Sequence, residues 1–409
     1  MNNVYALEDA INEIKRQFDG FKASEESICL YDCIGRVLSQ DVHANQDVPG
    51  FNRSSMDGYA VISKNTFGAT DNLPVLLKNV GEVHVGSVPN FSLSTDECAY
   101  IATGGQLPIA ADSVVMIENT TRLNDDTICI DTPSSPGNNI VFKGDDLVKG
   151  SVVLRKGRVL TPHTIGVLAS LGLDKIPVYR KINVGVISTG DELVDVGENL
   201  FDSMVYDVNS HTISAGIAKL GATPIRYGIV NDNWEALKIT LSKALSECDM
   251  VLISGGSSMG VMDLTKKLIN QAGSPGVIID GLAVKPGKPT ILGNSNGIPI
   301  FGLPGHPIST YLIFILLVRP LLFSMSGAEY KKSDYVKKAL LTNNIHSGNG
   351  REEFVPAIME LQGDTLYATP MHYKSGLTSM LRDADGFVII PRNSEGCQKG
   401  ETVEVLLAD

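Results

Sequence analysis

Residues 181–328 alternate short β-rich runs with helical patterns, and this alternation limits the fold more than any other feature of the sequence. The runs are nearly continuous in apolar character, which is typical of strands buried on both faces of a sheet. They cover residues 182–187, 223–230, 249–254 and 299–302. The segment is therefore predicted to be an α/β domain with a parallel sheet, whose ligands bind beyond the carboxyl ends of the strands.

Two helices between these runs have recognisable starts. Asn209 is predicted to be the N-cap of a helix that ends at Gly221, and Asn233 the N-cap of the next one, because asparagine is among the residues that best satisfy free backbone N–H groups. The second helix carries one apolar face, made of Trp234, Leu237, Leu241 and Leu245.

The regions on either side of this segment have a different sequence pattern. Residues 46–140 and 329–409 contain short strands separated by turns, so each is predicted to be a small β domain. Helical patterns at 5–18 and 162–171 bracket the first of them, which is therefore expected to be an insertion into a discontinuous helical linking domain, 1–45 and 141–180. With the α/β domain at 181–328, the expected fold class is α/β plus β, multidomain, as the length of 409 residues suggests.

Composition excludes several classes of protein. Hydrophobic residues make up 43% and charged residues 20%, as in ordinary globular proteins. Lysine plus arginine total 34 against 46 acidic residues, a net charge of 34 − 46 = −12 that on average repels nucleic acid and anionic lipid. We therefore expect neither as a partner, and any anionic ligand needs a local basic pocket.

Three further features indicate a cytoplasmic protein. The six cysteines are dispersed without CxxC spacing, which fits a reduced setting. The first 20 residues carry acidic side chains and helical apolar spacing, unlike a secretory signal. The most apolar run, 311–323, is interrupted by Arg319 and Pro320 and is shorter than the ~18 to 20 residues of a membrane span, so it is predicted to be a buried helix.

Glycine-rich and proline-rich loops follow the predicted strands. Gly255 and Gly256 open a loop that offers backbone N–H groups to an anion, and Asp263 starts the next helix; a plain strand-to-helix turn with Asp263 as a cap explains this segment equally well. The loop Lys285-Pro286-Gly287-Lys288-Pro289 holds two ammonium groups on a stiff backbone, which suits a small oxyanion or phosphate better than an ordinary solvated turn does.

The segment 302–309 is a third rigid loop, and it leads into the buried helix. Ser309 is predicted to cap that helix, and an anion near the lysines could share its positive end. His306 is interpreted as a turn residue rather than a catalytic one.

Carboxylates also collect just after the strands: Asp191, Glu192, Asp207, Asp232 and Asp263. Helix capping can account for each of them separately. Their shared location indicates a magnesium-phosphate site, because Mg²⁺ takes one or two carboxylates together with phosphate oxygens and water.

Seven segments taken together resemble the molybdopterin molybdenumtransferase family, which includes the bacterial MoeA proteins and the E domain of gephyrin. They are Arg53-Ser54-Ser55-Met56-Asp57-Gly58-Tyr59-Ala60, Thr103-Gly104-Gly105-Gln106-Leu107-Pro108, Gly144-Asp145-Asp146, Ser188-Thr189-Gly190-Asp191-Glu192-Leu193, Ser254-Gly255-Gly256, Lys285-Pro286-Gly287-Lys288-Pro289 and Gly302-Leu303-Pro304-Gly305. Each is weak alone, but their order and spacing over nearly the whole chain are specific.

The resemblance implies an enzyme that converts adenylylated molybdopterin and molybdate to molybdenum cofactor, with release of AMP and with Mg²⁺ as cofactor. It also implies four domains and a homodimer, with the active cleft between the sheet domain of one subunit and the small β domain of the other. A molybdopterin adenylyltransferase is a further partner that the family suggests.

Carried over by motif, the implied site has two halves of opposite charge. The implied molybdate ligands are Lys285, Lys288, Ser309, Arg351 and Ser375. The implied catalytic carboxylates are Asp57, Glu192, Asp232 and Asp263, of which Asp232 and Asp263 would hold the metal. The implied pterin and nucleotide contacts are Thr103, Asp146, Thr189, Gly255, Gly256, Pro304 and Pro307.

Three positions depart from the family pattern: His306 where asparagine is common, Asp145 where glutamate is common, and Gly281 where many members carry a lysine. Alternative functions are a molybdopterin adenylyltransferase-like enzyme, which needs no flanking β domains, a tungstate-inserting enzyme, and a non-enzymatic dimeric scaffold. The paired lysines and the carboxylates favour an enzyme over a scaffold.

Overall fold

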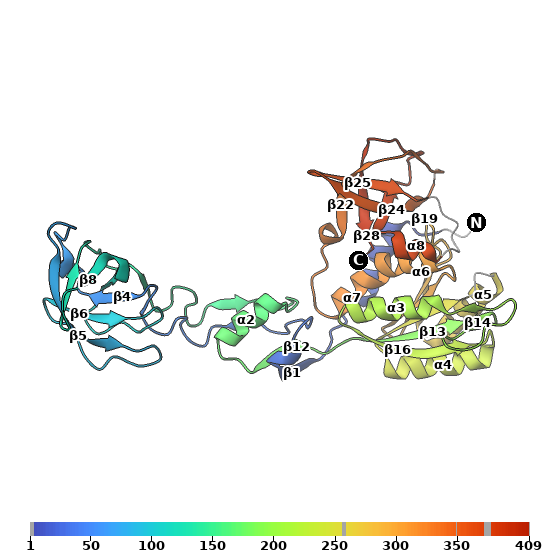
Figure 1. Ribbon diagram of the computed structural model, residues 1–409. Helices are drawn as coiled ribbons and strands as arrows, with labels where there is room; N and C mark the ends of the chain where they lie inside the picture. The colour runs from blue at the N-terminus through green and yellow to red at the C-terminus, as the bar shows by residue number, and fades with distance from the viewer. Residues whose placement is uncertain (1–3, 256–258, 349, 372–377, 409) are drawn as a thin grey trace. The chain divides into compact units, whose positions relative to one another are not determined.

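The computed structural model describes residues 4–255, 259–348, 350–371 and 378–408. It divides into two compact units (Figure 1), which are considered separately below. The first unit comprises Met1–Ser39, Gly157–Thr161 and Lys175–Asp409, and the second comprises Gln40–Lys156 and Pro162–Asp174.

The centre of the first unit is a six-stranded sheet in the order β16-β13-β17-β21-β20-β18. Four neighbouring strands are parallel, as predicted: β16 (Thr223–Val230), β13 (Asn183–Thr189), β17 (Met250–Gly255) and β21 (Ile298–Leu303). Two further strands were not expected: β20 (Ile291–Ser295) pairs antiparallel with β21, and β18 (Pro275–Asp280) pairs antiparallel with β20. Asn296 and Gly297, both at positive φ (52° and 97°), form the tight hairpin turn between β20 and β21.

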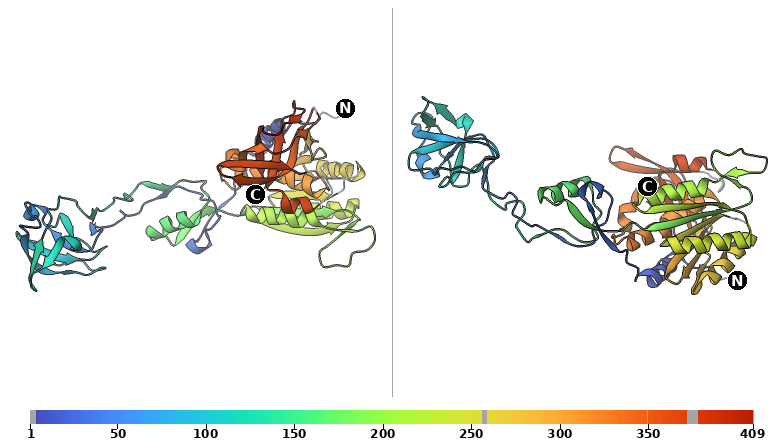
Figure 2. Two further views of the ribbon diagram at one scale, coloured as in Figure 1. Left: turned by 45° about the horizontal axis from the view of Figure 1, so that its top comes forward. Right: turned by 90° about the horizontal axis from the view of Figure 1, so that it is seen from below.

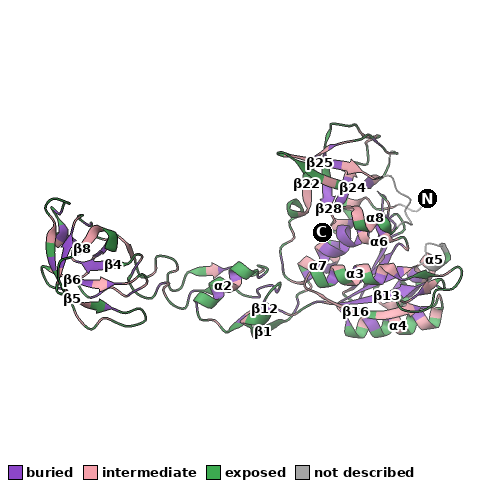
Figure 3. Cartoon of the chain, viewed as in Figure 1, coloured by how far each residue is buried: buried purple, intermediate pink, exposed green. Residues whose placement is uncertain are grey.

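Helices cover both faces of this sheet (Figure 2). Because strand side chains alternate, Met250 and Leu252 of β17 join the core that includes α3 (Val208–Lys219), whereas Val251 and Ile253 join the core beneath α4 (Trp234–Glu247) and α5 (Met259–Ala272). Figure 3 shows the consequence, with β13 buried and the outer side of α4 exposed. The nearly continuous apolar runs of the sequence are explained by this burial on two sides.

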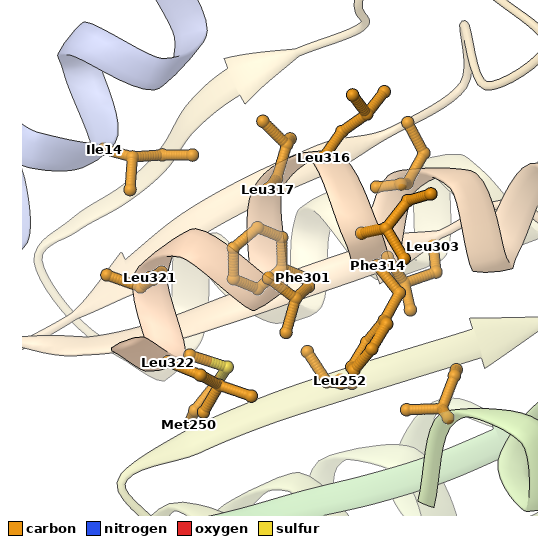
Figure 4. Close-up of a cluster of buried hydrophobic side chains, with 14 of the residues drawn as sticks. Ile14, Met250, Leu252, Phe301, Leu303, Phe314, Leu316, Leu317, Leu321 and Leu322 are labelled. Atoms are coloured by element: carbon orange, nitrogen blue, oxygen red, sulfur yellow. The ribbon is translucent and has the colours of Figure 1, made fainter. Parts of the chain in front are cut away.

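One long helix packs into the first core and runs from α6 (Pro307–Ile313) through a π-helical turn (Phe314–Val318) to α7 (Arg319–Met325). Figure 4 shows its side chains Phe314, Leu317 and Leu321 among those of the sheet. The buried helix predicted over residues 311–323 is confirmed, and it is longer than the apolar run: it continues through Arg319 and Pro320, where a π turn precedes a proline that can donate no backbone hydrogen bond. Among the described residues, this 19-residue helix has the length and composition of a membrane span, but 78% of its most apolar window is buried in the protein.

Helix capping follows the sequence only in part. Asn233 caps α4 as predicted, accepting bonds from the backbone N–H groups of Glu235 and Ala236. The cap of α3 is Asp207 and not Asn209, which lies inside the first turn. Helix α1 (Leu7–Phe18), also predicted, buries Ala10, Ile14 and Phe18 and contacts α7.

The C-terminal part of the first unit is a second sheet, as predicted. Its strands are β22 (Val336–Leu341), β24 (Glu352–Gln362), β25 (Thr365–Pro370), β26 (Gly386–Ile390) and β28 (Thr402–Leu407), with the short helix α8 (Ser379–Asp383) before β26. The pairing of β24 with both β25 and β26 closes these strands into a ring. A further strand, β19 (Val284–Lys285), comes from the α/β segment and pairs in parallel with β24. In the same unit, β1 (Glu25–Cys29) pairs with β12 (Lys175–Tyr179).

The second unit contains the predicted small β domain, a six-stranded sheet in the order β7-β4-β6-β5-β9-β8. The strands are β4 (Gly58–Val61), β5 (Val75–Val83), β6 (Glu97–Ile101), β7 (Ser113–Met116), β8 (Thr120–Arg122) and β9 (Thr127–Ile130). Two short ladders, β3 (Arg53–Ser54) with β10 (Ile140–Val141) and β2 (Val42–His43) with β11 (Val152–Leu154), and helix α2 (Pro162–Ser170) complete the unit. Gly58 cannot be replaced freely, because a Cβ atom there would lie 1.9 Å from the carbonyl oxygen of Val115.

Candidate active site

A pocket of about 580 Å³ opens at the carboxyl ends of β13, β17 and β21. Thr189 ends β13, Gly255 ends β17, and the loop after β21 contributes Pro307. Glu192 lines the wall formed by the segment that follows β13. Four of the residues singled out in the sequence therefore meet at the sheet edge where a parallel α/β sheet binds its ligands.

Two further residues brace this pocket. The buried carboxylate of Asp207 accepts bonds from the hydroxyls of Ser188 (2.6 Å) and Ser210 (2.5 Å) and from the backbone N–H of Ser210 (3.0 Å). The Asn209 side-chain amide donates to Ser254 Oγ (2.9 Å) and to the Gly305 carbonyl (2.8 Å). Both residues line the pocket, and Asn209 ties the ends of two strands together.

The sequence indicated the wrong role for Asn209. It was expected to cap α3, but Asp207 takes that role and leaves the asparagine amide for the neighbouring loops. The spacing Asp207-x-Asn209 could have revealed this, because an aspartate two residues earlier is an equally good cap.

Asp232 is held at the same edge by its neighbours. The Thr189 hydroxyl donates to Asp232 Oδ1 (2.6 Å), and the Asp232 backbone N–H donates to Asp191 Oδ1 (3.2 Å). Gly255 keeps this corner tight, because a Cβ atom there would lie 1.8 Å from the Thr189 carbonyl oxygen. Two carboxylates, a hydroxyl and a glycine from three adjacent strands are thus brought together.

The structure changes the interpretation of Asp263. Helix α5 begins at Met259, so Asp263 lies in its second turn and does not start the helix as expected. Its carboxylate is exposed and 3.8 Å from the ammonium of Lys266, which also pairs with Asp280 at 2.9 Å. Capping is therefore excluded as the role of this acid, and the structural partner that remains is Lys266, one turn further along the helix.

Among the residues that the structure describes, no three His, Cys, Asp or Glu side chains are grouped so as to hold a metal ion. The carboxylates that are present still suit Mg²⁺, which needs only one or two of them when a substrate supplies phosphate oxygens. Asp232, oriented by Thr189 with Asp191 beside it, is the better prepared of the two predicted ligands.

The two lysines of the loop 285–289 have different surroundings. Lys285 Nζ lies 2.8 Å from Glu353 Oε1, whereas Lys288 is exposed and forms no ion pair with another residue of the described ranges. The loop between them is held from inside: the Thr290 hydroxyl donates to the Gly287 carbonyl (2.7 Å), and the Leu282 N–H donates to the Lys288 carbonyl (3.0 Å). The predicted stiffness of this loop is thus accounted for.

Strand pairing brings Arg351 toward the same region. It directly precedes β24, whose first two residues, Glu352 and Glu353, are in register with Val284 and Lys285 of β19. Arg351 is exposed. A long stretch of sequence separates it from the lysines, so only the sheet register places it beside the strand that leads into their loop.

The remaining predicted contacts are placed as follows. Ser309 is 4% exposed and lies inside α6; the N-cap position belongs to His306, so the capping role expected for Ser309 is wrong. Pro304, also buried, accepts a hydrogen bond from the Thr310 hydroxyl through its carbonyl. Ser375 and Gly256 lie outside the described residues.

The departures from the family pattern have local explanations. His306 lines the pocket next to Pro307. Gly281 has φ +91°, a conformation that a lysine adopts only with strain. Asp145 Oδ2 accepts a bond from the Phe142 N–H (2.7 Å), which closes a turn.

In the second unit, two of the motif segments are interlocked. Thr103 donates from its backbone N–H (2.6 Å) and from its hydroxyl (2.9 Å) to Asp57 Oδ1. These bonds, the backbone one first, hold the pKa of the Asp57 carboxyl below its ordinary value, because they stabilise the charged form. The Gly104 N–H donates to the Ser54 carbonyl (2.8 Å), while exposed Asp146 lies on a loop that bonds Val48.

Comparisons with known proteins match three successive regions of the chain. Residues 5–172 match the MoeA N-terminal region (domains I and II), residues 185–324 match the MoCF_biosynth family, a probable molybdopterin binding domain, and residues 338–408 match the MoeA C-terminal region (domain IV). The molybdopterin molybdenumtransferase of Bacillus subtilis is 32% identical over 403 residues, covering 97% of this chain and 93% of its own. The chain belongs to the molybdopterin molybdenumtransferase (MoeA) family.

Further members of the family agree. The molybdopterin molybdenumtransferase of Haemophilus influenzae is 32% identical and covers 94% of each chain. The crystal structure of the molybdopterin biosynthesis MoeA protein from Pyrococcus horikosii matches with a TM-score of 0.87 and 39% identity, and covers 100% of both chains. The chain is therefore an enzyme of molybdenum cofactor biosynthesis, a transferase with the multidomain α/β plus β fold of this family.

Proposed function

We propose that the protein inserts molybdate into adenylylated molybdopterin and releases AMP, giving molybdenum cofactor. The observation that carries the proposal is the arrangement at the strand ends, where the Thr189–Asp232 bond and Glu192 border a pocket of about 580 Å³. A pocket of this volume is large enough for a pterin with a nucleotide part. The pterin and nucleotide contacts would be Thr189, Glu192, Gly255, Pro304 and Pro307, with Gly256 beside them.

The cationic side of the proposal rests on the loop 285–289 and on Arg351. A doubly charged oxyanion needs ammonium or guanidinium groups and hydroxyls. Lys285 at the end of β19, Lys288 in the loop that follows and Arg351 directly before β24 supply the charges. Ser309 and Ser375 would add hydroxyls. Holding molybdate close to the pterin sulfurs lowers the barrier mainly through proximity, so no covalent enzyme nucleophile is needed.

The acidic side is proposed to hold Mg²⁺, with Asp232 and Asp263 as its protein ligands. When bound there, the ion would supply positive charge to the phosphate that leaves as AMP. The chain's own contribution is orientation, because Thr189 holds one oxygen of Asp232 and leaves the other available. Asp57, Thr103 and Asp146 of the second unit are proposed as further substrate contacts, and the bonds from Thr103 lower the pKa of the Asp57 carboxyl.

A homodimer, a cytoplasmic location and delivery of substrate by a molybdopterin adenylyltransferase also belong to the proposal, on the basis of the family. Tungstate remains an alternative to molybdate, because the two oxyanions have the same charge and nearly the same size. A dimeric scaffold would need neither the lysine loop nor the carboxylates. These alternatives make different predictions for one experiment.

The experiment is a titration of the purified full chain with adenylylated molybdopterin, Mg²⁺ and either molybdate or tungstate, with AMP release as the readout. The proposal expects AMP release that depends on the oxyanion, and the ratio of the molybdate and tungstate constants gives the preference. Binding of the pterin without release of AMP would contradict the proposal and favour a scaffold or carrier.

A further inference from the structure

The ion pair between Lys285 and Glu353 joins two strands from different parts of the chain. Lys285 Nζ is 2.8 Å from Glu353 Oε1, and the two residues are register partners in the parallel pair β19–β24. The Glu352 N–H donates to the Ala283 carbonyl (2.9 Å), which fixes that register. The pair is therefore set by the backbone and not by two flexible side chains that meet at the surface.

The two members of the pair differ in exposure. The Glu353 side chain is 7% exposed, whereas that of Lys285 is 48% exposed. The second carboxylate oxygen of Glu353 accepts the Ser347 hydroxyl at 2.5 Å, so the carboxylate cannot rotate freely. A buried carboxylate is costly without a partner, and Lys285 is the cation that compensates it.

The ion pair with Glu353 gives Lys285 a different environment from that of Lys288, the other lysine of the loop. Lys288 is exposed and forms no ion pair within the described residues. The ammonium of Lys285 is held at a fixed point while about half of the side chain stays open to solvent, so it can still donate to a second anion. One ammonium of the loop is therefore held at a fixed point by an ion pair, while the other is exposed without one.

We propose that Glu353 is a positioning residue for the oxyanion site: it holds the Lys285 ammonium where the oxyanion is bound, and Ser347 holds Glu353. This inference rests on the proposed function insofar as Lys285 binds molybdate. It predicts that molybdate affinity depends more on the position of the Glu353 carboxylate than on its charge. A purely structural role of Glu353, or a purely electrostatic one, does not predict this order.

The first test needs no substrate. A double-mutant cycle of Lys285→Met and Glu353→Gln is followed by calorimetric unfolding of the full chain. Lys285→Met leaves a buried carboxylate unpaired and is expected to lower the Tm by roughly 5 °C or more, and Glu353→Gln in the same chain should restore part of the loss. Additive effects of the two substitutions would overturn the pairing.

The second test separates geometry from charge. Glu353→Asp keeps the charge but withdraws the carboxylate by roughly 1.5 Å, and Glu353→Gln keeps the reach but removes the charge. We expect Glu353→Asp to raise the molybdate Kd, measured by titration calorimetry, and the molybdate KM by about tenfold, with less than a twofold change for the pterin substrate. Glu353→Gln should have the smaller effect of the two.

Val355→Ala is the matched control, since Val355 lies two residues further along β24 and is buried. It should lower the Tm without a selective effect on molybdate. Wild-type molybdate constants in Glu353→Asp, tighter molybdate binding in Glu353→Gln, or equal losses for both substrates would each overturn the positioning role.

The outcomes also separate this inference from the proposed function. Molybdate binding with the expected order of variants, but without AMP release from the wild type, would contradict the function and support the inference. AMP release with the variants in the reverse order would do the opposite. A wild-type protein that binds no molybdate would overturn both.

Discussion

Thr103 gives both of its hydrogen bonds to a single oxygen of Asp57 and leaves the other carboxylate oxygen available. The backbone N–H and the hydroxyl together lower the pKa of this exposed carboxyl in the small β domain. An exposed carboxylate that is both oriented and anionic is what a cation or a donor group of a substrate can use. The relationship also makes a direct prediction about pH.

Thr103→Val should raise the pKa of Asp57 toward its ordinary value, but only in part, because the backbone N–H is the larger cause and remains. Since the folded pKa is lowered, the two bonds stabilise the fold above the unfolded pKa, and this contribution is lost as the pH falls through the folded pKa. Carbon-detected NMR of the Asp57 carboxyl measures the shift, with Thr103→Ser as the control that keeps the hydroxyl. An unchanged titration in Thr103→Val would contradict the assignment.

Lys288→Ala and Arg351→Ala should each weaken molybdate use about ten- to a hundredfold, because each removes a charge-assisted contact worth about 1.5 to 3 kcal/mol. Pterin binding and thermal stability should change little, since both side chains are exposed. Lys288→Arg should rescue only partly, because a planar fork replaces a compact charge. Steady-state AMP release at varied molybdate measures this, and Lys338→Ala, at an exposed lysine on β22, is the control. Equal effects of Lys338→Ala and Lys288→Ala would argue against the oxyanion site.

Asp232→Asn and Asp263→Asn should both lower AMP release and raise the magnesium requirement, since each removes an anionic ligand. The Asp232→Asn substitution keeps the shape of the side chain, and its amide oxygen can still accept the Thr189 hydroxyl. Asp263→Ala should leave unfolding unchanged or slightly stabilise α5, because the residue caps nothing and alanine is the better helix former. Titrating AMP release with magnesium in each variant tests whether Asp232 and Asp263 are metal ligands. Wild-type magnesium dependence in both asparagine variants would remove the metal site.

Asp207→Ala should destabilise the α/β domain by at least about 2 kcal/mol, because it removes a helix cap and leaves the Ser188 and Ser210 hydroxyls without their acceptor. Asp207→Asn should cost less, since one oxygen stays. Urea unfolding followed by the fluorescence of Trp234, the single tryptophan of the chain, reports on this domain because the residue begins α4. A silent Asp207→Ala would show that the three bonds contribute no net stability.

Gly255→Ala should disrupt the corner between β13 and β17, because the new Cβ would lie 1.8 Å from the Thr189 carbonyl oxygen and the strands would have to separate. Gly260→Ala is the matched control: nothing lies within 4 Å of its Cβ position in the first turn of α5, so no loss of stability is expected. Thermal unfolding of the two variants in parallel gives the comparison. Equal stability of both would contradict the close approach of the strands.

Much of the fold could be predicted, because buried strands and helices have characteristic patterns of apolar residues. The four parallel strands are apolar on both faces, and Asn233 precedes an amphipathic helix. The antiparallel pair β18 and β20 was missed because its strands carry glycine, serine and asparagine, which dilute the apolar pattern. The long buried helix was predicted, but its full length of 19 residues and its π turn were not, because a π turn cannot be read from residue types.

The sequence motifs predicted which residues belong to the site, but not which side chains they contact. The strand-end rule indicated Glu192 and Gly255, the family motif added Thr189, and the pocket contains all three. Capping was assigned wrongly at Asn209, Asp263 and Ser309, because capping residues and ligand-binding residues are drawn from the same chemical types. Glu353 gave no signal at all, since its meaning depends on the register of β24 against β19.

Strand β19 also has a consequence for how this protein could be recombined. Consider a chimera that joins the α/β part of one relative to the C-terminal β part of another at residue 329. Residue 329 is the domain boundary predicted from the sequence, so such a junction is expected to disturb neither part. It would nevertheless divide the pair β19–β24, and with it Lys285 from Glu353. Hybrids of this kind should therefore function only when the lysine loop and β24 come from the same parent or from matched parents. The unit that has to be exchanged as a whole is the strand pair β19–β24 together with its loop.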